Sequence, residues 1–189
     1  QAKGLIKLVD VAPEQPGNLE FIRQMSHDVR VSVAHTCTGY DDACAAFDAG
    51  ARHMTHLFNA MPALHHREPG PIAAGAERND VTAEIIADGV HIHPAMVRLA
   101  FALFGDDRMR ACGLGDGEYE LGGQQFFVKG NRATIANGSL AGSVSDVMAC
   151  MRTAVRTMGI PLTSAVKAAT VNPARALGLD GKLGAIAPG

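Results

Sequence analysis

The chain of 189 residues predicts an α/β fold in which helices cover a parallel sheet. Short apolar runs alternate with segments whose apolar residues recur every three or four positions, and the connections between them are mostly short. This alternation is typical of β-α-β units, because two parallel strands need a crossover connection, usually a helix, to bring the chain back. The elements are taken below in chain order.

The first strand is predicted over residues 5–11, a short apolar run. A helix is predicted over residues 18–26, where apolar side chains fall at helical spacing and Asn18 suits the N-cap position. The next apolar run, residues 29–34, predicts a second strand that ends at His35. The chain thus begins with a complete β-α-β unit.

An alanine-rich helix is predicted over residues 40–49, and Gly50 suits the position after its last turn. A third strand then leads to His56. Residues 61–75 follow as an irregular stretch rich in proline and glycine. A long connection of this kind after a strand more often carries function than not.

A fourth strand is predicted over residues 82–89, and a helix over residues 94–104 with Pro94 in its first turn. A further strand is due next, but none is predicted in residues 106–113. Residues 118–135 alternate and turn in the manner of an antiparallel ribbon. The C-terminal part is predicted to be helical, with helices over residues 145–158, over residues 162–170 and from residue 173 to residue 177.

Composition narrows the classes of function. Hydrophobic residues make up 47% of the chain and the formal net charge is −2, so there is no broad basic surface for nucleic acid. No apolar stretch approaches the roughly 20 residues that span a bilayer. The 4 cysteines are scattered without a C-x-x-C pair, and we expect a cytoplasmic protein. The start of the chain shows neither an initiator methionine nor a secretory signal, so we expect it to begin part-way into a gene product.

Two histidines are the strongest candidates for chemistry. His35 and His56 each stand where an apolar strand meets a polar turn. The carboxyl ends of parallel strands meet at one side of the sheet, where (β/α) barrels do their chemistry. Two neutral imidazoles there could bind a divalent metal that activates water. The alternative for either histidine alone is a hydrogen-bonded core residue, and a third ligand for the metal is not evident.

Other residues are weaker candidates. His91 and His93 alternate on a segment predicted to be extended, so one of them would face the site and the other the helices. Arg67 could bind a phosphate or carboxylate through its guanidinium, or could form a surface ion pair with Glu68. We expect Cys37 to be a small buried residue beside the site rather than a nucleophile.

Two blocks of sequence carry a family resemblance. THLFNAMP at residues 55–62, with REPG at residues 67–70, resembles the N-acetylglucosamine-6-phosphate deacetylases of the amidohydrolase superfamily. Further matching blocks lie, in order, at residues 11–14, 34–36, 86–91, 140–143 and 172–176. The first pair of blocks is quite specific to this family, whereas the last block is shared more widely among amidohydrolases.

The resemblance implies an α/β fold, namely a TIM-type (β/α) barrel of the metal-dependent amidohydrolase kind that is incomplete in this chain. Residues 1–189 would form a partial barrel with an inserted β ribbon at about residues 117–136, and the flanking β-sandwich domain would be largely absent. The implied reaction is metal-dependent hydrolysis of the N-acetyl amide of N-acetylglucosamine 6-phosphate. Its products are glucosamine 6-phosphate and acetate, and a homodimer is the implied assembly.

Matching motifs also imply roles for residues. His35 and His56 would be ligands of a divalent metal ion, for which we expect zinc, with iron, manganese or cobalt as alternatives. Asn59 and Ala60 would contact the sugar phosphate. Arg67 would provide positive charge to the phosphate across a dimer interface.

The remaining implied contacts come from the second half of the chain. His91 would bind the sugar. The pocket around the acetyl group would be lined by Leu140, Ala141 and Gly142. The partner implied by all these contacts is a small amino-sugar phosphate.

The chain also departs from the family pattern. The first metal ligand of the family, a glutamate, would precede Gln1, and the sandwich strands would follow Gly189. The family's catalytic aspartate would fall between Met109 and Arg110, where no strand is predicted. We expect that stretches are missing at these three places, which a measurement of the intact mass would test.

Two alternatives remain open on the sequence. Another amidohydrolase, such as a cyclic amidase or a deaminase, would share the metal site but would not need the REPG block. A non-catalytic barrel that binds sugar or metal would retain the ligands without releasing acetate.

Overall fold

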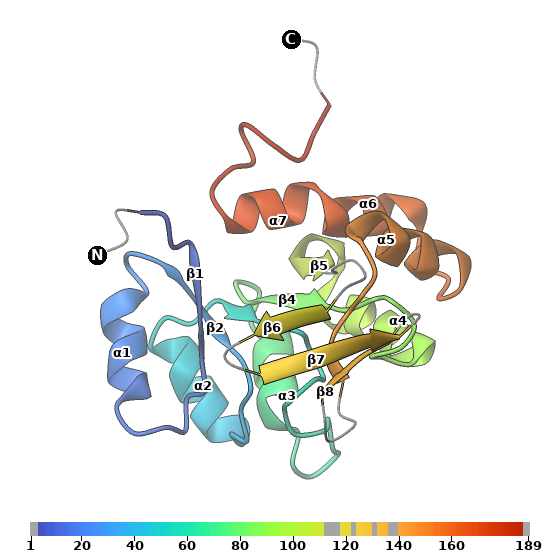
Figure 1. The fold of residues 1–189 in the computed structure, drawn as a ribbon. Coiled ribbons are helices and arrows are strands. Elements are labelled where there is room, and N and C mark those ends of the chain that lie inside the picture. Colours follow the sequence, from blue (N-terminus) through green and yellow to red (C-terminus); the bar gives the residue numbers. More distant parts are fainter. Residues whose placement is uncertain (1–3, 112–117, 122–123, 130–131, 136–139, 187–189) are drawn as a thin grey trace.

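The computed structural model describes residues 4–111, 118–121, 124–129, 132–135 and 140–186, and a parallel sheet of five strands forms its centre (Figure 1). The strands lie side by side in chain order: β1 (Leu8–Val11), β2 (Arg30–Val33), β3 (His53–Met54), β4 (Thr82–Ile85) and β5 (Met109–Ala111). Each neighbouring pair is parallel. The predicted alternation of strands and helices is therefore confirmed, although β1 and β4 are shorter than predicted.

Strand β5 corrects the prediction that residues 106–113 contain no strand. It follows the short 3-10 helix η1 (Asp106–Arg108), and Met109–Ala111 pair in register with Ala83–Ile85 of β4. The strand has only three residues and carries the charge of Arg110 at its centre. No apolar run therefore marks it in the sequence, and its pairing with β4 defines it.

The helices α1 (Asn18–Met25), α2 (Tyr40–Asp48), α3 (Gly70–Ala76) and α4 (Pro94–Phe104) connect the strands. Gly17, with a φ of 84°, occupies the N-cap of α1, and Asn18 is the first helical residue. The prediction of Asn18 as the N-cap is therefore wrong. The Asn18 amide instead donates to the carbonyl of Ala12 at 2.9 Å and ties the helix to the end of β1.

Helix α3 lies partly inside the stretch that was predicted to be irregular. Pro71 stands in its first turn, where a missing N–H does no harm. A Cβ atom at Gly75 would lie 2.4 Å from the sulfur of Met54 on β3, so this helix approaches the sheet closely because it has no side chain there. Close packing, which local sequence does not show, stabilises this glycine-containing helix.

The two faces of the parallel sheet differ in chemistry. In-register neighbours point to the same side, and one row across β1, β2 and β3 consists of Asp10, Ser32 and His53. The same face carries Glu84 beside Arg110. The opposite face holds buried apolar residues that belong to the hydrophobic core with the helices, among them Val31, Val33, Met54, Ala83, Ile85 and Met109. The helix side thus stabilises the fold, and the other side carries polar and charged groups.

The second sheet is antiparallel, with strands β6 (Glu118–Leu121), β7 (Gln124–Lys129), β8 (Arg132–Ile135) and β9 (Leu140–Gly142). In the view of Figure 1, β6 and β7 lie in front of the parallel sheet. Strand β9 extends the ribbon beyond residue 135, where the sequence predicted its end.

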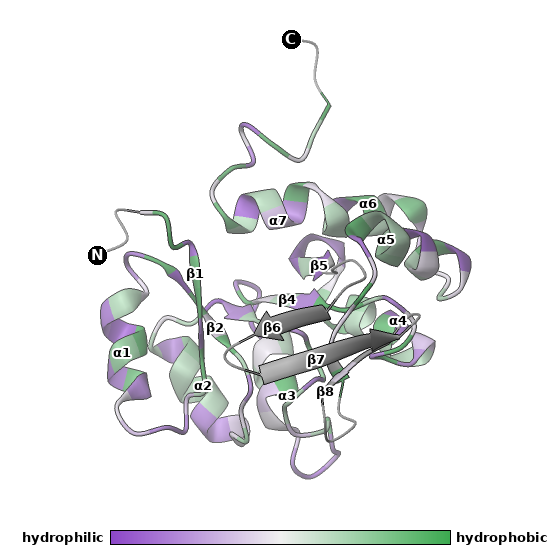
Figure 2. Cartoon of the chain, in the orientation of Figure 1, coloured by the Kyte–Doolittle hydropathy of each residue, from purple (hydrophilic) through white to green (hydrophobic). Residues whose placement is uncertain are grey.

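The chain continues through α5 (Val147–Arg156), α6 (Leu162–Ala169) and α7 (Val171–Ala176), of which α6 and α7 pack against β5. Figure 2 shows both hydrophobic and hydrophilic residues on these helices. After α7 the chain turns back onto this helix: the N–H of Leu179 donates to the carbonyl of Ala174 at 2.8 Å, and a Cβ atom at Gly184 would lie 2.8 Å from the Cα of Val171. Within the described ranges, no helix has the length and apolar character needed to cross a bilayer.

Candidate active site

His35 and His56 lie together at the carboxyl ends of β2 and β3. Their ring centroids are 4.6 Å apart and the rings are nearly perpendicular, at 78°. Both residues have left-handed backbone conformations, with φ of 45° at His35 and 37° at His56. Non-glycine residues rarely adopt this conformation, and it concentrates at functional sites. The structure therefore brings the two predicted metal ligands together, on strained turns.

The turns that carry the two histidines are bonded to each other. The backbone N–H of Thr36 donates to the carbonyl of Ala60 at 3.0 Å. Ala60 itself has a φ of 49°, and Phe58 has a φ of 74°. In the described part of the chain, the positive-φ residues other than glycine are these two and the histidines. Backbone strain is thus confined to the two turns around the imidazole pair.

Glu14 forms two hydrogen bonds with the turn after His35. Its carboxylate accepts hydrogen bonds from Thr36 Oγ1 at 2.5 Å and from the N–H of Cys37 at 2.8 Å. Desolvation raises the pKa of Glu14, but these bonds outweigh it and lower the pKa below its usual value. The carboxylate is therefore ionised at neutral pH and remains an acceptor for both groups.

The environment of His56 suits a metal ligand. Burial lowers its pKa, and the neighbouring His35 lowers it further, so the ring is neutral at pH 7 and keeps a lone pair for a metal. Among the described residues, nothing donates to or accepts from the buried His56 Nδ1. An imidazole nitrogen in this state fits a metal ion. His35 is exposed, so an ion between the rings could also reach solvent.

Two carboxylates lie near the pair on the polar face of the sheet. Asp10 accepts a hydrogen bond from Thr55 Oγ1 at 2.6 Å and raises the pKa of His56. Glu84 lies 3.8 Å from His53 Nε2, and its carbonyl accepts from Leu57 N at 2.7 Å. In the ranges that the structure describes, no three His, Cys, Asp or Glu side chains are grouped closely enough to hold a metal. The described residues therefore offer a pair of imidazoles without the third protein ligand that a catalytic zinc usually has.

Asn59 and Ala60 follow His56 in the same turn. The Asn59 amide nitrogen donates to the carbonyls of His56 and Leu57, at 3.2 and 3.3 Å. Ala60 is exposed, and its carbonyl is engaged by Thr36. Both residues thus lie in the turn that follows His56, and their contact with a substrate stays a prediction.

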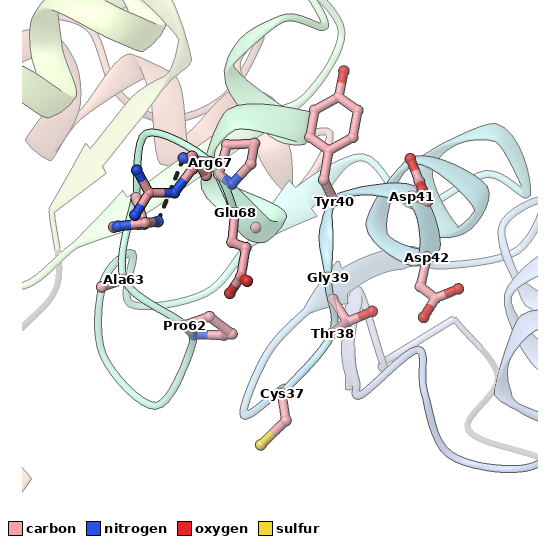
Figure 3. Close-up of a pocket in the computed structure, with 13 residues that line it drawn as sticks. Cys37, Thr38, Gly39, Tyr40, Asp41, Asp42, Pro62, Ala63, Arg67 and Glu68 are labelled. Atoms are coloured by element: carbon pink, nitrogen blue, oxygen red, sulfur yellow. Dashed lines mark hydrogen bonds between the residues drawn. The ribbon is translucent and has the colours of Figure 1, made fainter.

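Arg67 lines a neighbouring pocket of about 770 Å³ (Figure 3). In Figure 3, Arg67, Pro62 and Glu68 lie on one side of this pocket, and Thr38 and the acidic start of α2 lie on the other. The Arg67 guanidinium contacts His66 Nε2 at 2.7 Å, and no ion pair joins Arg67 to Glu68 among the described side chains. Neither His35 nor His56 lines the pocket, so Arg67 lies beside the imidazole pair and not within it.

Cys37 also lines this pocket and is exposed. The prediction that it is buried is therefore wrong. The reason is the turn geometry, in which Thr36 and Thr38 point inward and Cys37 points outward.

His91 and His93 differ in surroundings, as predicted, but His91 lies in a bend and only His93 has an extended backbone. The His91 side chain is almost fully buried, and its Nδ1 lies 2.8 Å from Asp88 Oδ2. His93 is exposed and caps α4, where its Nδ1 accepts from the N–H of Ala95 at 3.2 Å. Capping explains His93 fully, and His91 remains the candidate for substrate contact.

The predicted acetyl-pocket residues form β9. Leu140 is exposed and Gly142 is half-buried, and the backbone of Ala141 lies between them. Strand β9 pairs with β8, which places the three residues on the edge of the antiparallel sheet. Their position follows from sheet pairing, which their sequence does not reveal.

The expected catalytic aspartate has no counterpart in β5. The strand runs through Met109 and Arg110 without interruption, and Arg110 Nε donates to the carbonyl of Asn172 at 3.1 Å. Burial lowers the pKa of Arg110 to about 10, so it stays charged. The residues directly after Ala111 lie outside the described ranges.

Three acidic residues near the candidate site were not singled out from the sequence. These are Asp10, Glu14 and Asp88. Each lies at or after the carboxyl end of a strand, the same signal that marked the histidines. Applied to carboxylates as well as imidazoles, that signal would have found them.

Comparison with known proteins agrees with this geometry. Residues 15–189 match the model of the amidohydrolase family. N-acetylgalactosamine-6-phosphate deacetylase of Escherichia coli O157:H7 is 39% identical over 191 residues, which cover 97% of this chain and 51% of the relative. N-acetylglucosamine-6-phosphate deacetylase of Bacillus subtilis is 38% identical, over 100% of this chain and 50% of the relative.

Solved structures show the same similarity. The N-acetyl-D-glucosamine-6-phosphate deacetylase of Mycobacterium smegmatis, as a D267A mutant in complex with N-acetyl-D-glucosamine-6-phosphate, superposes with a TM-score of 0.88 at 40% identity. That superposition covers 94% of this chain and 50% of the solved chain. The enzyme of Pasteurella multocida gives a TM-score of 0.90 at 28% identity, over 98% of this chain and 50% of the other.

The chain thus spans about half the length of these relatives. The matches confirm the predicted fold, in which parallel strands and their helices form part of an amidohydrolase (β/α) barrel. Its sequence, its fold and the imidazole pair at the ends of adjacent strands lead to one conclusion: the chain belongs to the amidohydrolase family.

Proposed function

We propose that this protein hydrolyses the N-acetyl amide of N-acetylglucosamine 6-phosphate to glucosamine 6-phosphate and acetate. The observation that carries the proposal is the contact between His35 and His56 at the ends of β2 and β3. Relatives at 38–39% identity bear the names of deacetylases of amino-sugar phosphates. The reaction would belong to amino-sugar catabolism.

The metal is part of the proposal. Amidohydrolase enzymes generally depend on a metal, and His35 and His56 would hold a divalent ion, zinc by expectation, with iron, manganese or cobalt as alternatives. When bound, such an ion lowers the pKa of water and polarises a carbonyl. The proposal assigns proton transfer to no described residue, because β5 carries no aspartate.

Substrate contacts divide between two regions. Asn59, Ala60 and Arg67 would hold the phosphorylated sugar, with Arg67 providing positive charge. His91 would bind a sugar hydroxyl, and residues 140–142 would surround the acetyl group. These contacts would orient the substrate so that its amide is held near a water molecule. Holding the reacting groups in this geometry raises the reaction rate.

The proposal also includes the oligomeric state of the protein and its cellular compartment. Arg67 is exposed and lines an open pocket, which supports its use by a second subunit of a homodimer. Cys37 and Cys44 form no disulfide among the described residues, which supports a reducing compartment such as the cytoplasm.

A second candidate substrate is N-acetylgalactosamine 6-phosphate, which differs only in the configuration at C4. It is favoured by the 39% identity to a deacetylase named for that sugar. The acetyl amide and the phosphate are shared, so both substrates use the same machinery.

Acetate release from purified, zinc-loaded protein tests the proposal. We expect turnover of one or both phosphorylated sugars, and kcat/KM lower by at least about tenfold for unphosphorylated N-acetylglucosamine. An Arg67→Ala variant should lose this preference for phosphate, whereas an Arg23→Ala variant on the exposed side of α1 should keep it. Equal rates with and without the phosphate would overturn the role of Arg67. Bound metal and sugar without acetate release would favour a non-catalytic barrel.

A further inference from the structure

The turn after β4 encloses a carboxylate that the proposed reaction does not use. The side chain of Asp88 is 1% exposed. Its Oδ1 accepts from the N–H of Val90 at 2.8 Å and from the N–H of His91 at 3.0 Å. Its Oδ2 lies 2.8 Å from His91 Nδ1. Three hydrogen bonds within one turn thus surround this buried group.

The ionisation state of Asp88 determines which nitrogen of the His91 imidazole carries the proton. Desolvation raises the pKa of Asp88, but hydrogen bonds from His91, Val90 and Ser143 outweigh it and hold the pKa far below its usual value. A carboxylate that is always ionised only accepts hydrogen bonds. His91 Nδ1 must therefore carry the proton, and in the neutral ring Nε2 carries the lone pair.

Asp88 also connects His91 to a second segment. Ser143 directly follows β9, is 6% exposed, and donates its hydroxyl to Asp88. One buried carboxylate therefore joins the bend that carries His91 to the strand that carries residues 140–142. Both segments are those that the proposed function assigns to substrate contact.

We propose that Asp88 is the positioning residue that holds His91 as the Nδ1–H tautomer, so that Nε2 accepts a hydrogen bond from a sugar hydroxyl. Asp88 acts through His91 and does not touch the substrate. The sugar contact of His91 rests on the proposed function, whereas the tautomer rests on the geometry alone. An amide in place of the carboxylate keeps the shape of the side chain but can donate to Nδ1, which reverses the tautomer.

The first test measures the tautomer of the His91 ring directly. Long-range ¹H–¹⁵N correlation spectra of the histidine rings, with His91 assigned by its loss in His91→Gln, should show Nδ1–H in the unsubstituted protein. In Asp88→Asn the proton should move to Nε2. A ring with Nε2–H in the unsubstituted protein would overturn the inference.

The second test measures KM for the substrate in the zinc-loaded enzyme. Asp88→Asn should raise KM for N-acetylglucosamine 6-phosphate by about tenfold or more, with metal content unchanged, as for other residues that orient a functional histidine. Because Asp88 acts through His91, the double variant with His91→Gln should be no worse than His91→Gln alone. The matched control is Asp146→Asn, since Asp146 also accepts from a backbone N–H, that of Ala149 at 2.6 Å, and asparagine caps a helix equally well.

The outcomes separate the two proposals. If the unsubstituted enzyme releases no acetate but shows the Nδ1–H ring and its reversal in Asp88→Asn, the proposed function fails and the role of Asp88 in holding the tautomer stands. If the enzyme is active and Asp88→Asn leaves both the tautomer and KM unchanged, the role of Asp88 is wrong. If the effects of Asp88→Asn and His91→Gln on KM were additive in the double variant, this would also contradict the role of Asp88.

Discussion

Thr36 donates its backbone N–H to the carbonyl of Ala60 at 3.0 Å, and this bond joins the two turns that carry His35 and His56. The side chain of Thr36 extends the link, because its hydroxyl donates to Glu14 at 2.5 Å and accepts from the N–H of Thr38 at 3.0 Å. Turns with left-handed residues persist only where their surroundings hold them. Thr36 is therefore central to the geometry of the imidazole pair.

Replacement of Thr36 by valine should destabilise the protein and loosen the site. Thr36 is 2% exposed, so loss of its hydroxyl leaves the N–H of Thr38 without its acceptor in a buried place. We expect the free energy of unfolding to fall by about 1–3 kcal/mol in guanidinium titrations. Zinc affinity, measured by competition with a chelator, should fall by about tenfold or more.

Thr38 provides the matched control. It is also 2% exposed, but its hydroxyl oxygen has no hydrogen-bond partner among the described residues. Thr38→Val should therefore be neutral or slightly stabilising, because an unpaired buried polar group is removed. Equal destabilisation by the two substitutions would show that Thr36 acts through shape and not through its hydrogen bonds.

His56→Gln should remove metal from the protein. The substitution keeps a polar side chain of similar size but removes the imidazole whose Nδ1 is buried without a partner. We expect zinc content, measured by elemental analysis after dialysis, to fall to background and acetate release to fall by at least about a hundredfold. His27, an exposed histidine after α1, gives the control, and His27→Gln should retain both. Full metal content in His56→Gln would exclude His56 as a ligand.

Arg108 should be a major contributor to stability. Its guanidinium donates to the carbonyls of Phe104 and Arg78, both at 2.6 Å, and of Leu103 at 3.0 Å. Lysine carries its donors on a single nitrogen and cannot span these carbonyls as the planar guanidinium does, so Arg108→Lys should lower the free energy of unfolding by about 2–3 kcal/mol. The exposed Arg156 offers a control in which the same exchange should cost less than about 0.5 kcal/mol.

His53 should make stability depend on pH. Burial lowers its pKa in the folded protein, although Glu84 opposes this. The unfolded chain therefore binds more protons as the pH falls through about 6.5, the usual value for histidine. The contribution of His53 to the free energy of unfolding is therefore fully present above that pH. Below it, the contribution falls by at most about 1.4 kcal/mol per pH unit.

Unfolding titrations at pH 7.5, 6.5 and 5.5 in a chelator would measure this dependence. The free energy of unfolding should fall less steeply with acid in His53→Gln than in the unsubstituted protein. His56 is half-buried and also has a lowered pKa, but it is present in both proteins, so the difference between the two slopes measures the contribution of His53. Parallel slopes would show that His53 does not titrate differently on unfolding.

The sequence predicted elements well where the signal was local. The spacing of apolar residues located α1, α2 and α4 to within a residue or two, since a helix packs one face at a fixed period. It failed at β5, because a three-residue strand with Arg110 at its centre has no apolar pattern. It also missed the helix α3, where close approach of Gly75 to Met54 replaces side-chain packing.

By itself, the sequence determined the alternation of strands and helices, the family blocks and the place of His35 and His56 at strand ends, because periodicity and motif spacing are carried by neighbouring residues. Only the tertiary structure decided that the two rings meet, that Thr36 ties their turns together, and that Asp88 engages His91 beside β9. These relationships join residues on different strands or fix the orientation of side chains. Both depend on register and packing, which only the folded chain sets.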